Sequence, residues 1–362
     1  MNFSVVKLTG KSFDEILKHI NGGHSKTEVV KATIKDNEYQ VELKTKITAI
    51  EGFKFGSVEE EFSIGDISLR CTGFNVYTER PRKSDIWLDE RNQLKNNVEL
   101  VNPYTSDFLV YEYNQEVFAL GLAGINRVKA LLKDAFLLQL NQIIPQRFDI
   151  NEDFLYWLFK RFIDTPSESL IGGEQLYITS LDSYVGKTRD NVNAMRGEGD
   201  GISIILGTLA FLFNNEELKS IRPTVQYGEE KILFEIGLTG TFKVWPISYR
   251  GKLFRAATGI KKEFLLTSYI SLILIPILVK SYRGSLDKKT WSTQLKIDFI
   301  KRLGERIMKE VQGVLIGIEE VSGIALSEEQ SEMDLDEARD LVDDDEEILP
   351  LDEEHLVEET DD

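Results

Sequence analysis

The last 36 residues hold the entire net charge of the chain, and this limits what the rest of the sequence can fold into. Residues 327–362 contain 19 Asp and Glu and one Arg, a balance of −18. Residues 1–326 therefore hold 42 acids and 42 bases. A segment this acidic cannot bury enough apolar surface to fold alone. We expect a neutral, compact body followed by a disordered acidic tail.

The body reads as a mixture of strands and helices. The hydrophobic fraction of 42% over the whole chain and the 20 Phe indicate a folded core, and the length of the body allows two domains. Within residues 1–120, several segments rich in Val, Ile, Thr and Tyr alternate apolar and polar residues, which is typical of antiparallel strands. We predict an α+β fold with two β-rich, mainly antiparallel halves, each followed by helices.

Helix signals and turn residues set the expected domain boundaries. An apolar stripe predicts a helix over residues 125–143, and Asn151 is placed to cap the next helix. Strands are expected again at 175–185 and within 224–249, and helices at about 262–280 and 290–315. A cluster of Pro, Ser and Gly separates the two halves. The expected domains are residues 1–168, residues 169–326 with a basic surface, and the tail at 327–362.

The cysteine and histidine counts bear on the compartment and on metal binding. Cys71 has no partner for an internal disulfide, and the N-terminus lacks a signal-peptide pattern, so we expect a cytoplasmic protein. Three His and one Cys exclude a Cys/His zinc cluster, and we predict neither a metal nor another cofactor.

The apolar run Phe264–Val279 is shorter than the ~20 residues that span a bilayer. A buried helix is expected there, with peripheral membrane association through residues 261–283 kept as an alternative.

Three weak motifs bear on catalysis. YVGKT at 184–188 matches the end of a phosphate-binding loop, but the required first glycine is replaced by Leu181, so no such loop is predicted. Asp36, Glu42 and Lys44 have the residue types of a Mg²⁺-dependent nuclease, which is the main enzymatic alternative.

The third motif, MRGEGDGIS at 195–203, presents Glu198 and Asp200 among three glycines and is more typical of a tight turn. In the enzymatic alternative, these two carboxylates form a second candidate site. Solvated strand faces and turns commonly carry the same residue types, so the sequence favours a protein that is not an enzyme.

The strongest binding signal lies in residues 221–326, which hold 17 bases and 10 acids. SYRGKL at 248–253 and SYRGSL at 281–286 match at five of six positions and bring bases together with Tyr249, Phe254 and Tyr282. Basic groups neutralise phosphates and aromatic rings stack on unpaired bases, so this composition favours DNA or RNA binding through residues 249–289. The predicted contacts are Arg250, Lys252, Arg255, Lys261, Lys262, Lys280 and Arg283.

The tail has apolar residues within its acidic run. Ile348, Leu349 and Leu351 lie inside DDDEEILPLDEE and are our candidate partner-binding residues. Three interpretations stay open. The tail is a solvated terminus, it orders on a partner protein, or it lies on the basic third as a phosphate mimic.

Taken together, these patterns favour a non-enzymatic subunit of a cytoplasmic protein or nucleic-acid assembly, with a regulatory acidic tail. Another protein subunit is the expected partner, together with DNA or RNA. The absence of housekeeping motifs suggests a bacterial or phage defence system as the setting. The alternatives are a Mg²⁺-dependent nuclease and a peripheral membrane protein.

Overall fold

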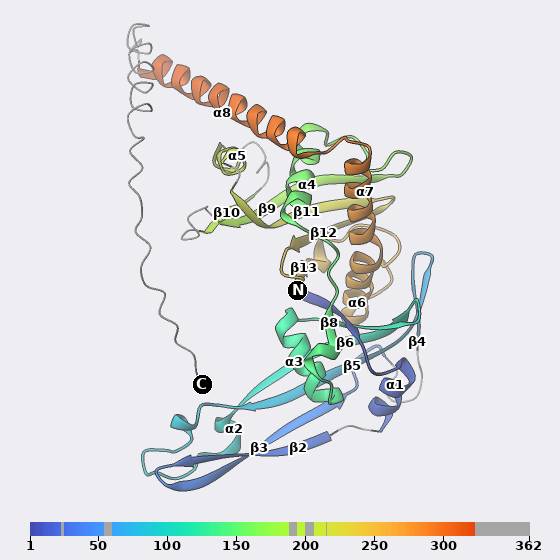
Figure 1. Ribbon diagram of the computed structural model, residues 1–362, viewed down its shortest axis with the longest axis vertical. Coiled ribbons are helices and arrows are strands. Elements are labelled where there is room, and N and C mark those ends of the chain that lie inside the picture. The colour runs from blue at the N-terminus through green and yellow to red at the C-terminus, as the bar shows by residue number, and fades with distance from the viewer. Residues whose placement is uncertain (23–24, 54–59, 188–193, 200–205, 215, 323–362) are drawn as a thin grey trace, which may run out of the picture. The chain divides into compact units, whose positions relative to one another are not determined.

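A computed structural model describes residues 1–22, 25–53, 60–187, 194–199, 206–214 and 216–322 (Figure 1). The chain divides into two compact units, Met1–Gly304 and Glu305–Asp362. Only the first 18 residues of the second unit are described. The predicted disorder of residues 327–362 concerns residues outside the described ranges.

The described strands form a 13-stranded antiparallel sheet with the order β10-β9-β11-β12-β13-β1-β7-β6-β5-β3-β2. In addition, β4 pairs with β5 and β8 pairs with β1. The strands before residue 150 are β1 (Asn2–Leu8), β2 (Ser25–Ile34), β3 (Asn37–Thr48), β4 (Glu60–Ile64), β5 (Ile67–Pro81), β6 (Val101–Tyr113), β7 (Glu116–Gly121) and β8 (Ile143–Pro145). The later strands are β9 (Leu176–Lys187), β10 (Ala194–Glu198), β11 (Glu217–Tyr227), β12 (Glu230–Gly237) and β13 (Phe242–Val244).

The first strand joins the early and late parts of the sheet. The N-terminal end of β1 pairs with β13, with Phe3 opposite Phe242, and the rest of β1 pairs with β7. The Phe3 and Phe242 rings stack with their centroids 5.5 Å apart. The α+β class is confirmed. The strands of the two predicted halves belong to one sheet.

Helices α1 (Phe13–Asn21) and α3 (Ile125–Phe136) cover the early strands. Ser12 and Glu15 form the capping box that begins α1, as their spacing predicts. The apolar faces of both helices enter one buried cluster with residues of β1, β5, β6 and β7. A short helix, α2 (Asn97–Leu100), brings Leu100 against Val41 and Trp87 in a smaller cluster.

Helix α3 is shorter than the predicted helix over residues 125–143. It ends at Phe136 because Leu137 adopts the left-handed conformation, with φ of 54°, and its backbone N–H donates to the Lys133 carbonyl. The chain then turns, and Ile143 pairs with Leu8 as part of β8. The apolar stripe therefore belongs to a helix followed by a strand, because both elements bury their apolar residues against the same sheet.

Helix α4 (Glu152–Asp164) packs on β9 and β11 and is almost entirely buried from Phe154 to Phe159. The Asn151 side chain accepts a hydrogen bond of 2.8 Å from the Phe154 N–H, so the predicted cap is confirmed. A short helix, α5 (Leu206–Phe213), follows β10 along the chain and buries Leu209, Phe211 and Leu212.

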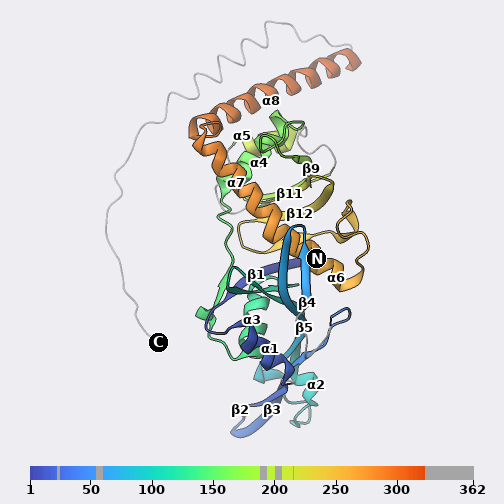
Figure 2. The same cartoon turned by 90° about the vertical axis from the view of Figure 1, so that its right-hand side faces the viewer.

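A 29-residue helical segment runs from Gly259 to Asp287 (Figure 2). It consists of α6 (Gly259–Tyr269), a π-helical turn named η5 (Ile270–Leu274) and α7 (Ile275–Asp287). It is the one helix among the described residues that is long and apolar enough to cross a membrane, but 72% of its most apolar window is buried. Helix α8 (Thr293–Ser322) follows, and its early residues Phe299 and Leu303 are buried.

Candidate nucleic-acid interface

The seven predicted contact residues lie in two groups at opposite ends of the Gly259–Asp287 helix. The first basic cluster consists of Arg250, Lys252, Arg255, Lys261 and Lys262, in the loop after β13 and the first turn of α6. The second basic cluster contains Lys280 and Arg283 on α7. Lys262 and Lys280 are 18 residues apart on this helix, which corresponds to about 27 Å along its axis.

A buried carboxylate holds the loop of the first cluster. Glu230, which is 5% exposed, accepts hydrogen bonds from the backbone N–H groups of Lys252 at 3.0 Å and Leu253 at 3.2 Å. Its other oxygen accepts from the Tyr249 hydroxyl, and that hydroxyl accepts from the Phe254 N–H at 3.1 Å. The backbone from Tyr249 to Phe254 is therefore fixed from inside, while Arg250 and Lys252 stay at the surface.

The basic side chains of this cluster, exposed at Arg250 and Lys252 and half-buried at Lys262, make weak contacts. The Arg250 guanidinium donates to the Ile247 carbonyl at 2.9 Å, and Lys252 Nζ pairs with Glu229 at 2.6 Å. The Lys262 ammonium lies 5.5 Å from the centre of the Tyr249 ring. Surface pairs of this kind contribute little because water and salt screen them. An incoming phosphate can replace them at small cost.

The first turn of α6 adds backbone donors to the same cluster. Thr258 stands at the N-cap in an extended conformation, but its side chain makes no capping hydrogen bond. The turn contains Lys261 and Lys262 and no acid. Unsatisfied N–H groups at a helix N-terminus favour an anion. A hollow of about 460 Å³ lies against this turn, although its lining also includes Glu51 and Asp107.

The second cluster lines a hollow of about 830 Å³. Three segments form its walls: the connection that follows β8, the loop that follows α4, and α7 with the residues just after it. Its basic residues are Arg147, Arg161, Lys280, Arg283 and Lys288, and its acidic residues are Asp149, Glu168 and Asp287. Bases therefore exceed acids by two around this hollow, which favours an anionic ligand.

Ion pairs occupy some of these charges and leave others available. Arg283 pairs with Asp149, and Arg161 pairs with Glu168 at 3.5 Å. Within the described part of the chain, Lys280, Arg147 and Lys288 form no ion pair. These three bases are available to an anionic ligand at the mouth of the hollow.

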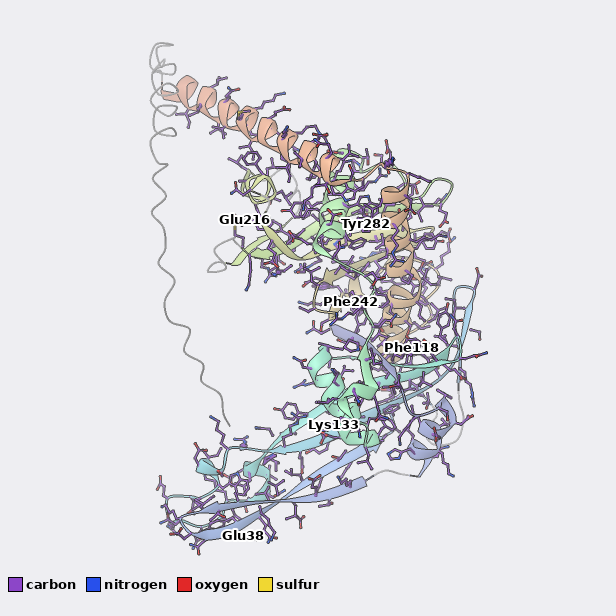
Figure 3. All side chains as sticks on the ribbon, viewed as in Figure 1. Glu38, Phe118, Lys133, Glu216, Phe242 and Tyr282 are labelled. Atoms are coloured by element: carbon purple, nitrogen blue, oxygen red, sulfur yellow. The ribbon has the colours of Figure 1, made fainter. Side chains whose placement is uncertain are left out.

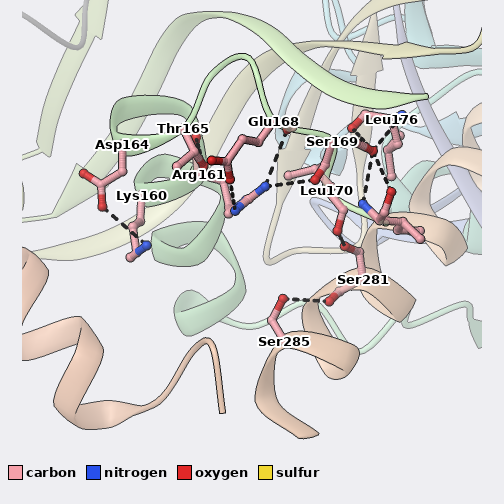
Figure 4. Close-up of polar contacts among 11 residues, drawn as sticks. Lys160, Arg161, Asp164, Thr165, Glu168, Ser169, Leu170, Leu176, Ser281 and Ser285 are labelled. Atoms are coloured by element: carbon pink, nitrogen blue, oxygen red, sulfur yellow. Dashed lines mark hydrogen bonds and ion pairs between the residues drawn. The ribbon is translucent and has the colours of Figure 1, made fainter. Parts of the chain in front are cut away.

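The loop after α4 has a defined conformation (Figure 4). The Arg161 guanidinium donates to the Ser169 carbonyl at 3.0 Å, and the Ser281 hydroxyl of α7 donates to the Leu170 carbonyl at 2.5 Å. The Ser169 hydroxyl accepts from the Leu176 N–H at 3.3 Å. These bonds connect α4, the loop and α7, so the wall of the hollow is preformed.

The aromatic residues expected to stack on bases lie in the core. Tyr249, Phe254 and Tyr282 are 6%, 3% and 6% exposed. Tyr282 contacts the Phe154 ring edge-on at 5.5 Å and donates from its hydroxyl to Asp153 at 2.6 Å (Figure 3). The expectation that these rings stack on nucleic-acid bases is therefore wrong for this conformation, because the fold uses them for packing.

The two similar hexapeptides have different structures. SYRGKL lies in the loop held by Glu230, whereas SYRGSL is part of α7. Their shared Tyr residues donate to two different carboxylates, the buried Glu230 and the half-buried Asp153. The sequence match therefore reflects no structural repeat.

Raising the pH above 10 is expected to destabilise the folded chain. Burial raises the pKa of Tyr249, Tyr269 and Tyr282 above the ordinary value of 10.0. The unfolded chain then loses protons before the folded chain does, so stability is complete below pH 10 and falls above it, by up to about 1.4 kcal/mol per pH unit for each group.

Urea unfolding at about pH 9 and about pH 11 measures this loss. A Tyr249→Phe variant controls for it, because it should show a smaller loss between the same two pH values. Equal losses in the variant and the parent would exclude Tyr249 as a contributor.

The nuclease candidates are spread along an exposed hairpin. Asp36 is in the turn between β2 and β3, with φ of 64°, close to Glu38, which Figure 3 labels at the end of this hairpin. Glu42 and Lys44 share an exposed face of β3, and five residues of strand, about 17 Å, separate Glu42 from Asn37. The searched, described residues contain no group of three His, Cys, Asp or Glu that could hold a metal.

The second pair of catalytic candidates, Glu198 and Asp200, does not form a catalytic site among the described residues. Glu198 is on β10 and pairs with Arg222 at 2.9 Å and with Arg196 at 2.7 Å. The hydrogen bond from Arg222 lowers the pKa of Glu198. Asp200 lies outside the described residues, as do the partner-binding candidates Ile348, Leu349 and Leu351.

Two basic residues of the larger hollow were not among the contacts predicted from the sequence. Arg147 follows β8 as an isolated base, and Arg161 lies in a helix that reads as apolar nearly all round. Charge clustering along the chain could not reveal them, because only the packing of α4 and α7 brings them beside Lys280 and Arg283.

Comparisons with known proteins add no identification. No protein-family model matches the chain, and no curated protein matches it at a significant level. Arguments about function therefore rest on the chain's own residues.

Proposed function

We propose that this protein is a non-enzymatic interaction subunit of a cytoplasmic protein–nucleic-acid assembly, and that it binds nucleic acid through phosphate contacts. One observation carries the proposal: the predicted basic residues lie at the surface in two clusters, whereas the neighbouring aromatic rings are buried. A surface with exposed bases and buried rings suits the phosphate backbone better than unstacked bases.

The spacing of the clusters suits a double-stranded ligand. Their separation of about 27 Å corresponds to roughly eight base pairs at the rise of about 3.4 Å per phosphate along one strand. Phosphate contacts carry no sequence information, so binding should be independent of sequence and should weaken with salt. The acidic tail enters the proposal as a regulatory segment, because its charge of −18 has the same sign as the ligand.

Charge reversal in either cluster is expected to weaken binding to a duplex of about 20 base pairs by about tenfold or more. Arg255→Glu with Lys262→Glu tests the first cluster, and Lys280→Glu with Arg283→Glu tests the second. Each pair should also reduce the slope of log K against log salt by about two, because two phosphate contacts are lost. Fluorescence anisotropy at several salt concentrations measures both quantities.

Lys44→Glu with Lys46→Glu is the matched control, because it makes the same charge change on the exposed face of β3. It should retain most of the binding. If neither the full chain nor a chain ending at residue 326 binds, and no salt slope appears, the nucleic-acid proposal is wrong. An equal loss in the control would show that total charge matters rather than the two clusters.

A further inference from the structure

The larger hollow, which contains the second basic cluster, has the size of a small-molecule site. Its volume of about 830 Å³ lies within the range of about 300–1,000 Å³ that is usual for such sites. A duplex, whose major groove alone is about 12 Å wide, is too large to enter it. The walls, two of which are seen in Figure 4, therefore admit one unit of a strand or a small molecule.

A glycine opens the α7 wall of this hollow between two lysines. Lys280, Gly284 and Lys288 follow one another at steps of four residues, which places them on one face of the helix. Apart from its own helical turns, a Cβ atom at Gly284 would meet no described atom within 4 Å. Glycine is unfavourable inside a helix, and packing does not require it here. It leaves a gap in the wall between the two ammonium groups.

The charges around this gap match a phosphate monoester. Arg147, Lys280 and Lys288 are exposed and, among the described residues, form no ion pair. The excess of two positive charges around the hollow corresponds to the charge of about −1.5 to −2 on a monoester at pH 7. A phosphate inside a strand carries a single negative charge. The hollow therefore suits a terminal phosphate better than an internal one.

Phe148 supplies an aromatic surface inside the same hollow. It is half-buried, and it is the one aromatic residue among the described residues that line this space. Its ring meets Phe242 at an interplanar angle of 73°, with the centroids 5.5 Å apart. An edge-on contact of this kind covers at most one face of the Phe148 ring. Stacking on an aromatic ring is open to every base. The hollow thus offers one base a surface beside the phosphate-binding wall.

We propose that the larger hollow binds a nucleoside monophosphate unit, either at the end of a nucleic-acid strand or as a free nucleotide. Lys280, Lys288 and Arg147 bind its phosphate, and Phe148 stacks on its base. The inference rests on the proposed function, because it uses the second basic cluster. It adds a preference for terminal phosphates that contacts along a duplex backbone do not give.

End modification and free nucleotide test the two sources of this ligand with the full-length protein. In fluorescence anisotropy, a duplex with single-stranded overhangs should bind about tenfold more tightly with terminal phosphates than with terminal hydroxyls. In calorimetry, adenosine 5′-monophosphate should bind more tightly than adenosine or inorganic phosphate. An effect of the strand ends alone assigns the hollow to strands, and binding of the free nucleotide alone assigns it to nucleotides.

A neutral substitution tests the hollow itself. Gly284→Leu fills the gap without changing the charge, so it should remove the preference for terminal phosphates and weaken nucleotide binding by at least about tenfold. Gly313→Leu in α8 is the matched control, since this glycine also has no described atom within 4 Å of its Cβ position, and it should bind like the parent. Equal binding by the Gly284→Leu variant and the parent would overturn the assignment to this hollow.

A second variant tests the stacking contact. Phe148→Leu keeps an apolar side chain against Phe242 and should weaken nucleotide binding by about fivefold or more, while leaving the binding of inorganic phosphate unchanged. Inorganic phosphate that binds as tightly as the nucleotide would overturn the nucleoside part of the proposal. If strands bind with a salt slope but neither terminal phosphates nor free nucleotide matter, this inference is wrong and the proposed function stands. If the nucleotide binds and no strand does, the proposed function is wrong and the hollow is a nucleotide site.

Discussion

Replacing Glu230 with alanine is expected to lower the free energy of unfolding by about 3 kcal/mol. The carboxylate is buried and accepts hydrogen bonds from two backbone N–H groups and from the Tyr249 hydroxyl. Removing it leaves these donors without an acceptor in a site that water reaches poorly, and hydrogen bonds to a charged group are the costly ones to lose. Urea unfolding followed by circular dichroism measures the change.

The adjacent Glu229 provides the control for this experiment. Its carboxylate is exposed and pairs with the Lys252 ammonium at 2.6 Å at the surface. Glu229→Ala should therefore change the free energy of unfolding by less than about 1 kcal/mol. Similar effects of the two substitutions would mean that Glu230 does not hold the loop.

Gly251 shows how closely this loop is fitted to the carboxylate. A Cβ atom at this position would overlap the Glu230 carboxylate and approach the Tyr249 hydroxyl to 2.6 Å. Glycine is needed here because the backbone passes directly over a buried charged group. The backbone of this loop is thus held in place while the side chains of Arg250 and Lys252 are exposed, which suits the proposed binding of phosphates.

Local features of the fold were predictable because they depend on neighbouring residues. The capping box of Ser12 and Glu15 and the Asn151 cap both satisfy N–H groups only three residues away. Alternating apolar residues likewise indicated the long strands. The end of α3 was missed because the apolar residues continue past Phe136 into β8, whereas the left-handed Leu137 ends the helix and residues 137–142 separate the two elements.

The candidate site was only partly predictable because its geometry depends on distant contacts. The sequence identified the basic residues at 250–262 and 280–283. They lie at opposite ends of one helix because residues 259–287 form a continuous helical segment. In the sequence, Tyr249 and Tyr282 lie among basic residues, which suggests that their rings are exposed to a ligand. They are buried, and carboxylates 19 and 129 residues away accept hydrogen bonds from their hydroxyls.

The second cluster depends on Asp153 in a similar way. One oxygen of this carboxylate accepts from the Tyr282 hydroxyl at 2.6 Å and from the Trp291 indole N–H at 2.7 Å. Both rings are buried, and the two bonds connect the first turn of α4 to α7 and to the residues just before α8. Lys280 and Arg283 therefore occupy a helix that is positioned by this contact.

Asp153→Ala should accordingly lower the free energy of unfolding by about 3 kcal/mol, because the Trp291 N–H loses its acceptor in the core. Asp153→Asn retains an acceptor oxygen and should cost about half as much. Glu152→Ala removes a neighbouring acid from the same turn and should cost at most about 1 kcal/mol, through the helix dipole alone. Urea unfolding followed by tryptophan fluorescence compares the three variants. If Asp153→Ala costs no more than Glu152→Ala, then packing of the rings alone holds α7, and the carboxylate does not position the second cluster.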